Sequence, residues 1–297
     1  MLSSPLFLSL ASVFTLLGLA LVSIAVSTDS WTEVTVNRRE ILNAFKREPE
    51  LSLRLQNAFG HNVLYFSRTY GLFHTCFPDT VPQDIGSFSK FNAPCIWNNE
   101  FNPPEAKREH YTNGEWYRLY AYRSSIICYA AGIVVVVLSL ITGILGCWNR
   151  SRKLVITTAI LLLIAALAMC LSMIGWHYVA YSERYSLDME PYYKSWEPVL
   201  KLTSRYNYGW SYIVSWVGIA FLMLGSVFMF WSYVAVKREE EMALSAKHGA
   251  YLMPNYYDKG AGAVVPYGYG TYGDYGTYPY YNQYNTAGYY GYMTYGR

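Results

Sequence analysis

The residues that could do chemistry in this sequence are, first, its five cysteines, which fall into two groups. Cys76 and Cys95 lie in a long polar segment between two apolar stretches, whereas the other three lie inside apolar stretches or at their ends. If the polar segment is outside the cell, in an oxidising compartment, these two cysteines are the pair expected to form a disulfide. Such a bond would close a loop of about 20 residues and contribute roughly 3 kcal/mol to stability.

Cys147 is the candidate for modification among the other three. It ends the second apolar stretch, beside Trp148 and near Arg150. A cysteine at the membrane surface could be palmitoylated, or it could be a thiol packed at the interface, and the sequence supports both interpretations. Cys128 and Cys170 lie within apolar stretches, where cysteine usually serves as a small packing residue.

Motifs for metal binding and catalysis are missing from the sequence. His74 and Cys76 have a spacing that two metal ligands could use, but no second pair of ligands follows nearby and Cys76 is assigned to the disulfide. There is no Gly-x-Ser-x-Gly motif, no His-Glu-x-x-His motif and no glycine-rich phosphate loop ahead of a helix. We therefore predict a protein that is not an enzyme and that holds no metal and no cofactor.

The elements that position these residues are mainly apolar stretches. Hydrophobic residues make up 53% of the chain, yet the mean hydropathy is only +0.10, so the apolar residues are gathered into blocks. Each of four stretches has about 22 residues, enough for a helix to cross a hydrocarbon core about 30 Å thick. None carries an Asp, Glu, Lys or Arg in its middle, which argues against a proton relay or a transport site. The stretches are residues 6–26, 125–147, 154–178 and 210–236.

Basic residues predict the orientation of these spans. Arg150, Arg152 and Lys153 occupy the short link between spans two and three, and Lys237 and Arg238 follow span four. Because basic residues in short loops stay in the cytoplasm, both termini are expected to be cytoplasmic, in a multi-pass protein of the plasma membrane surrounded by lipid. The net charge of +3 is small and scattered, so no nucleic-acid partner is expected.

The first apolar stretch also allows a second interpretation. Ala25-Val26-Ser27 would serve as the cleavage site of a signal peptide, but the stretch lacks a basic start and is long for such a segment. We expect a retained span. The chain then divides into span one (1–27), an outer loop domain (28–124), span two (125–147), a basic turn (148–153), span three (154–179), a second outer loop (180–209), span four (210–236) and a cytoplasmic, Tyr/Gly-rich disordered tail (237–297).

The outer loop domain is the only extramembrane part expected to fold by itself. Residues 38–57 read as a short amphipathic helix interrupted at Pro49. Residues 62–73 and 86–97 contain short runs rich in Val, Tyr, Phe and Trp, which favour a small antiparallel sheet. The predicted fold class is a membrane all-α four-helix bundle with a small extracellular antiparallel β-sheet.

The tail is of low complexity from about residue 249, where roughly half of the chain's 31 tyrosines alternate with Gly, Asn, Thr and Pro. Such a segment has almost no aliphatic residues for a core and is expected to be disordered. It could be a plain flexible tail, or a segment that clusters proteins or takes tyrosine phosphates.

Three short motifs resemble those of the claudin superfamily, and in particular its branch of calcium-channel gamma subunits and AMPA-receptor regulatory subunits typified by stargazin. They are a Thr-Asp-x-Trp after span one, a Gly-Leu followed by the two cysteines, and a Tyr-Gly-Trp-Ser at the start of span four. The residues that carry them, with an arginine before span two, are Asp29, Trp31, Gly71, Leu72, Phe73, Arg123, Tyr208, Gly209 and Trp210.

The resemblance implies a claudin-like fold and a regulatory or auxiliary subunit of an ion channel or receptor. The alternative that it implies is a cell–cell contact or junction protein of the claudin type, with a homotypic partner. The last four residues, Thr294-Tyr295-Gly296-Arg297, lack the apolar final residue that a PDZ groove requires, so binding to a PDZ scaffold is not expected.

Overall fold

The computed structural model of the chain describes residues 4–79, 81–82, 85, 95–149 and 151–252. Most of the tyrosine-rich tail, the four C-terminal residues weighed for PDZ binding, and residues 86–94 of the second predicted strand region lie outside the described residues. Residues 237–252, expected to be part of a disordered tail, are helical. Their Lys, Glu, Met, Ala and Leu residues are strong helix formers, which explains the difference.

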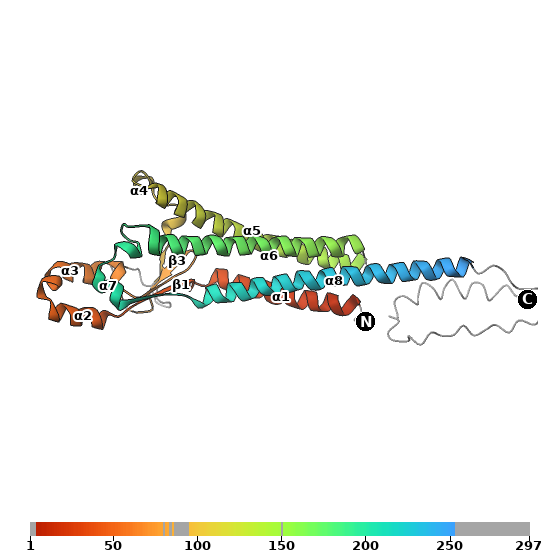
Figure 1. Cartoon of the computed structure of the whole chain (residues 1–297), viewed down its shortest axis with the longest axis horizontal. Helices are drawn as coiled ribbons and strands as arrows, with labels where there is room; N and C mark the ends of the chain where they lie inside the picture. Colours follow the sequence, from red (N-terminus) through yellow and green to blue (C-terminus); the bar gives the residue numbers. More distant parts are fainter. Residues whose placement is uncertain (1–3, 80, 83–84, 86–94, 150, 253–297) are drawn as a thin grey trace, which may run out of the picture. The chain divides into compact units, whose positions relative to one another are not determined.

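Four helices of the described part are long and apolar enough to cross a membrane. They contain the four apolar stretches but extend beyond them: α5, for example, begins 12 residues before residue 125. Side by side, these helices form a bundle (Figure 1). Their bounds are α1 (Ser4–Ser27), α5 (Asn113–Asn149), α6 (Arg152–Tyr181) and α8 (Trp210–Leu252).

Small and polar residues bring the helices together. A Cβ atom on Gly18 of α1 would lie 3.0 Å from the Gly218 carbonyl oxygen of α8, so the two backbones approach closely there. In the half of the bundle nearer the sheet, the Tyr129 hydroxyl of α5 lies 2.8 Å from the Ser215 hydroxyl of α8. The Ser215 hydroxyl in turn contacts the sulfur of Met173 on α6. This chain of contacts ties three helices at one level.

A five-stranded antiparallel sheet, in the order β4-β3-β2-β1-β5, lies at one end of the bundle (Figure 1). The predicted small antiparallel sheet is confirmed, but two of its strands were not anticipated. One is β1, which follows span one after a short turn, and the other is the edge strand β5, which comes from the second outer loop and pairs with β1. In β1, Val34 and Val36 point to the core while Glu33 and Thr35 are exposed. The strands are β1 (Thr32–Val36), β2 (Arg68–Tyr70), β3 (His74–Cys76), β4 (Cys95–Trp97) and β5 (Ser204–Tyr208).

Short helices complete the part of the chain beyond the bundle, which we call the sheet domain (described residues of 28–112 and 182–209). The predicted break at Pro49 is confirmed, since α2 ends at Arg47 and α3 begins at Pro49. The other helices are a 3-10 turn η1 (Val63–Tyr65), η2 (Asn99–Phe101), α4 (Glu105–Arg108), a π-helical turn η3 (Ser182–Ser186), η4 (Tyr193–Ser195) and α7 (Pro198–Thr203); α2 is Arg38–Arg47 and α3 is Pro49–His61.

The core of the sheet domain draws on both outer loops. Ile41 and Phe45 of α2 pack with Val34 of the sheet, and Trp196 and Leu200 from the second loop join the same cluster. The second outer loop is therefore a structural part of this domain, which differs from the expectation that the first loop folds by itself.

Candidate functional site

The junction between the sheet domain and the helices is where most of the motif residues meet, and we call it the joint: Asp29, Trp31, Gly71, Leu72, Tyr122 and Gly209. The first and last helices are tied there by backbone bonds. The Gly209 amide donates to the Trp31 carbonyl at 2.9 Å, and the Ser211 amide donates to the Ser30 carbonyl at 3.1 Å. These bonds extend the pairing of β1 and β5 down to the bundle.

Trp31 is the centre of the joint and is 1% exposed. Its indole Nε1 donates to the Ala25 carbonyl at the end of α1, at 2.8 Å. Its ring meets Tyr129 of α5 and Trp176 of α6 edge-on, with centroids 5.8 and 5.3 Å apart. Because an aromatic ring buries a large apolar area in a fixed orientation, Trp31 fixes how the first strand leaves the bundle.

Two motif glycines leave room for close backbone contacts. A Cβ on Gly71 would lie 2.2 Å from the Asp29 Oδ1 atom, and one on Gly209 would lie 1.9 Å from the Ser30 carbonyl oxygen. Both distances are far below van der Waals contact, so a larger residue at either position would force the joint apart.

The start of α5 is tied to the loop between β2 and β3. The Tyr122 hydroxyl donates to the Leu72 carbonyl at 2.7 Å, and both residues are buried. Phe73, which follows the Gly-Leu motif, stacks on Trp97 of β4 with centroids 6.3 Å apart. Arg123 donates from Nε to the Phe101 carbonyl at the end of the η2 turn, at 2.8 Å.

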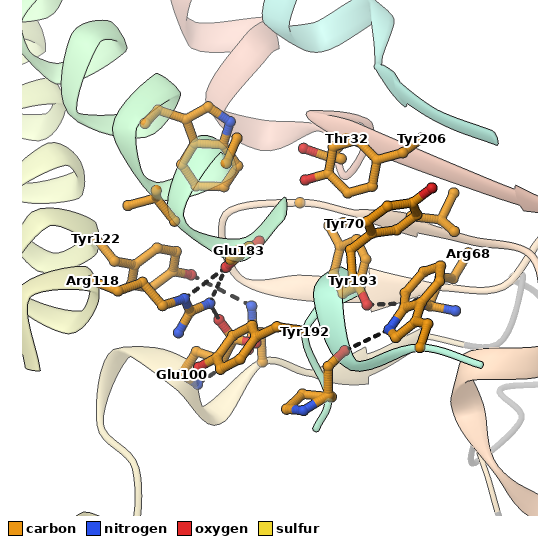
Figure 2. A pocket seen from close by; sticks show the side chains of 18 residues that line it. Thr32, Arg68, Tyr70, Glu100, Arg118, Tyr122, Glu183, Tyr192, Tyr193 and Tyr206 are labelled. Atoms are coloured by element: carbon orange, nitrogen blue, oxygen red, sulfur yellow. Dashed lines mark hydrogen bonds and ion pairs between the residues drawn. The ribbon is translucent and has the colours of Figure 1, made fainter. Parts of the chain in front are cut away.

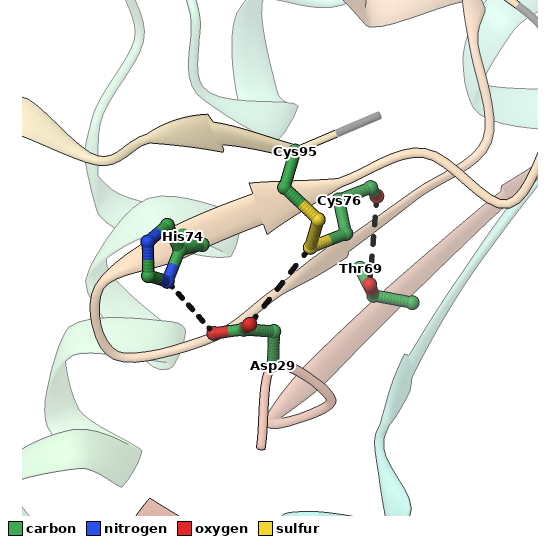
Figure 3. Close-up of a disulfide and its surroundings, with 5 residues drawn as sticks. All are labelled: Asp29, Thr69, His74, Cys76 and Cys95. Atoms are coloured by element: carbon green, nitrogen blue, oxygen red, sulfur yellow. Dashed lines mark hydrogen bonds and ion pairs between the residues drawn. A yellow bond between two sulfur atoms is a disulfide. The ribbon is translucent and has the colours of Figure 1, made fainter. Parts of the chain in front are cut away.

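The disulfide between Cys76 and Cys95 is present and joins β3 to the edge strand β4 (Figure 3). The Asp29 carboxylate approaches the Cys76 sulfur at 3.9 Å and lies 3.5 Å from Nδ1 of His74. Since a disulfide sulfur carries no hydrogen, the first of these is a packing contact. Within the described part of the chain, no three His, Cys, Asp or Glu residues are grouped so as to hold a metal ion.

A charged cluster beside the joint was missed in the sequence. The Arg118 side chain on α5 is 7% exposed, and its guanidinium lies between two carboxylates (Figure 2). Its Nε donates to Glu183 Oε1 at 2.7 Å, and its Nη2 contacts both Glu183 and Glu100. It therefore links α5, the η3 turn that follows α6, and the η2 turn. Both Arg118 and Arg123 precede the second apolar stretch, so the sequence does not show that their roles differ. The difference is visible only in the three-dimensional fold.

A cavity of about 70 Å³ adjoins this cluster, between the sheet and the helix ends (Figure 2). Burial, more than the nearby charges, raises the pKa of Tyr192 and of Tyr206 above the ordinary range, so both phenols are neutral. The charged and tyrosine residues in its lining are Arg68, Tyr70, Glu100, Arg118, Tyr122, Glu183, Tyr192, Tyr193 and Tyr206.

The remaining candidate residues lie away from the joint's centre. The Tyr208 hydroxyl is 2.9 Å from Nδ1 of His177, and Trp210 is half-exposed at the start of α8. Cys147 is exposed near the end of α5, at the opposite end of that helix from the joint, and Cys128 and Cys170 are partly buried. The structure thus groups most of the motif residues into one scaffold and leaves Cys147 outside it.

A comparison with protein families gives one match, which covers most of these elements. The model of the family described as PMP-22/EMP/MP20/claudin tight junction matches residues 16–231, from within α1 to within α8. No curated protein matches the chain significantly. The family match, the four apolar helices and the small antiparallel sheet agree with one another. The chain therefore belongs to the PMP-22/EMP/MP20/claudin family of multi-pass membrane proteins.

Proposed function

We propose that this protein is a non-enzymatic regulatory or auxiliary subunit of an ion channel or receptor, similar in role to stargazin and the calcium-channel gamma subunits. In this proposal the sheet domain is outside the cell, both termini are cytoplasmic and the bundle lies in the plasma membrane. The middle of each apolar stretch carries no acidic or basic residue, so the bundle offers no polar pathway of its own.

The observation that carries the proposal is the joint. Trp31, the two glycines and the Tyr122 hydroxyl hold the sheet domain in one position on the helices. The bundle could then contact the spans of a partner while the sheet domain contacts its outer domain. Once one of these contacts has formed, the other forms at a high effective concentration. The motifs that resemble the gamma-subunit branch, around Asp29 and Gly209, converge on this joint.

Affinity purification in mild detergent tests the proposal. We expect a much larger channel or receptor polypeptide to be recovered in a constant ratio with the protein. The Gly209→Ala variant, with its joint forced apart, should recover less of that polypeptide, whereas Gly60→Ala, where an added Cβ meets nothing within 4 Å, should recover the same amount. Recovery of copies of this protein alone would contradict the proposal.

A cell-contact function is the second candidate, favoured by the description of the matched family, which includes the claudins of the tight junction. Mixed cultures of expressing and non-expressing cells distinguish the two. Enrichment at contacts only where both neighbours express the protein supports the contact function, and a uniform surface distribution supports the auxiliary subunit.

Palmitoylation of Cys147 is a further proposal, supported by the exposed position of its thiol near the end of α5. Labelled palmitate should be incorporated into the wild type and lost in Cys147→Ala. Equal labelling of both proteins would exclude this site.

A further inference from the structure

Arg68 is a buried cation without a counter-ion among the described residues. Its side chain is 1% exposed. Its Nη1 donates to the carbonyls of Val63, Leu64 and Phe66 at 3.0–3.1 Å, and its Nε donates to the Tyr70 hydroxyl at 2.6 Å. All four acceptors are neutral, and its Nη2 has no hydrogen-bond partner within the described part of the chain. Buried charges are normally paired, so this guanidinium has capacity for an anionic group.

The opposite imbalance exists at the other end of the same cavity. There, the single guanidinium of Arg118 faces two carboxylates, Glu100 and Glu183, which leaves one negative charge in excess. Arg68 and this cluster both line the cavity. The four charges sum to zero, but they are separated into a positive end and a negative end, with tyrosine rings between them (Figure 2).

The size and entrance of the cavity limit what it could hold. Its volume of about 70 Å³ corresponds to roughly five water molecules on this measure, which suits a molecule of the size of glycine or γ-aminobutyrate. The Glu100 and Glu183 side chains keep 37% and 25% exposure, whereas Arg68 is 1% exposed, so the carboxylate end of the cavity is the more solvated one. A ligand would enter with its anionic group first and leave its cationic group at the mouth.

We propose that this cavity binds a small zwitterion of the amino-acid class, with its carboxylate at Arg68 and its ammonium group at Glu100 and Glu183. A zwitterion satisfies both ends while it keeps the buried charge at zero. A simple anion would leave the carboxylate pair uncompensated, and a simple cation would leave Arg68 without a partner. The proposal is independent of the auxiliary-subunit function, since it concerns a small molecule in the sheet domain.

Calorimetry on the full-length protein in nanodiscs tests the proposal, with γ-aminobutyrate and glycine as probes and with acetate and methylammonium as singly charged controls. We expect saturable binding of at least one zwitterion, and binding of each control at least tenfold weaker. Bound zwitterion should also raise the melting temperature by roughly 5–11 °C at a concentration about 100 times its Kd.

Glu100→Gln is the informative variant, because it removes one charge at the mouth and leaves Arg118 paired with Glu183. It should fold and should bind the zwitterion at least tenfold more weakly. Glu197→Gln, which changes an exposed carboxylate paired with Arg54, serves as the control and should bind as the wild type does. Absence of zwitterion binding to the wild type, equal binding of acetate, or undiminished binding to Glu100→Gln would each overturn the proposal.

Discussion

Replacing Arg118 by methionine should destabilise the protein by leaving two carboxylates without their cation. Glu183 is three-quarters buried and accepts from both Nε and Nη2 of Arg118, so its charge would be almost fully uncompensated. Removing one partner of a buried ion pair costs about 3–5 kcal/mol. Because Glu100 keeps 37% exposure and is partly solvated, we expect about 3 kcal/mol, at the lower end of that range. Methionine retains apolar contact with the Tyr122 and Tyr192 rings, which the guanidinium covers in the wild type.

A triple variant shows whether the loss of stability comes from the unpaired carboxylates or from altered packing around the methionine. Arg118→Met combined with Glu100→Gln and Glu183→Gln contains the same methionine but no unpaired carboxylate. Neutral groups are much cheaper to bury than charges, so the triple variant should recover most of the lost stability. Arg54→Met is the surface control, because it removes an exposed ion pair with Glu197 and should cost under about 1 kcal/mol.

Thermal unfolding of the purified variants in one detergent measures these differences. A loss of about 3 kcal/mol corresponds to a fall of roughly 6–12 °C in melting temperature for a chain of this size. The reasoning is refuted if Arg118→Met melts within about 2 °C of the wild type. It is also refuted if the triple variant is no more stable than the single one.

Three further predictions concern the joint and the sheet domain. Gly209→Ala places a Cβ 1.9 Å from a backbone oxygen, so its melting temperature should fall well below that of the control Gly60→Ala; equal values would show that the joint tolerates a side chain. Replacing Cys76 and Cys95 by serine should cost roughly 3 kcal/mol, measured by thermal unfolding without reductant, and addition of reductant should change the wild type but not the double variant. Burial raises the pKa of Tyr206. The stability that its neutral form contributes should therefore be complete below about pH 10 and should fall as the pH rises further. Tyr206→Phe should lose less stability between about pH 9 and pH 11 than the wild type does.

The sequence was most informative where a local pattern determines the structure. The lengths of the apolar stretches predicted the four long helices. An apolar stretch of this length is expected to cross a membrane, and there its backbone polar groups must be satisfied within a helix. Pro49 ended one helix and began the next because proline lacks an amide hydrogen and fits the first turn of a helix. The disulfide was predicted because Cys76 and Cys95 are the two cysteines of the segment expected outside the cell.

Contacts between distant segments could not be predicted in the same way. In the sheet, Thr32 pairs with Tyr208, which is far away in the sequence, and two five-residue strands carry too little alternation to reveal such a partner. Likewise, Arg118 is separated from Glu183 by 65 residues. Its importance depends on the meeting of three segments, which no local pattern records. Arg123, selected from the resemblance, instead makes one bond to a backbone carbonyl.

The claim that the joint holds the sheet domain in one position on the bundle is tested most directly by distance measurements between spin labels. One label replaces the exposed Thr35 on β1 and the other the exposed Ser124 on α5, after Cys128, Cys147 and Cys170 are replaced by serine or alanine. Pulsed electron resonance on the protein in nanodiscs should give a single narrow distance distribution, and Gly209→Ala should broaden it. A broad or bimodal distribution in the labelled protein that keeps Gly209 would contradict the account, because the sheet domain would then move freely on the helices.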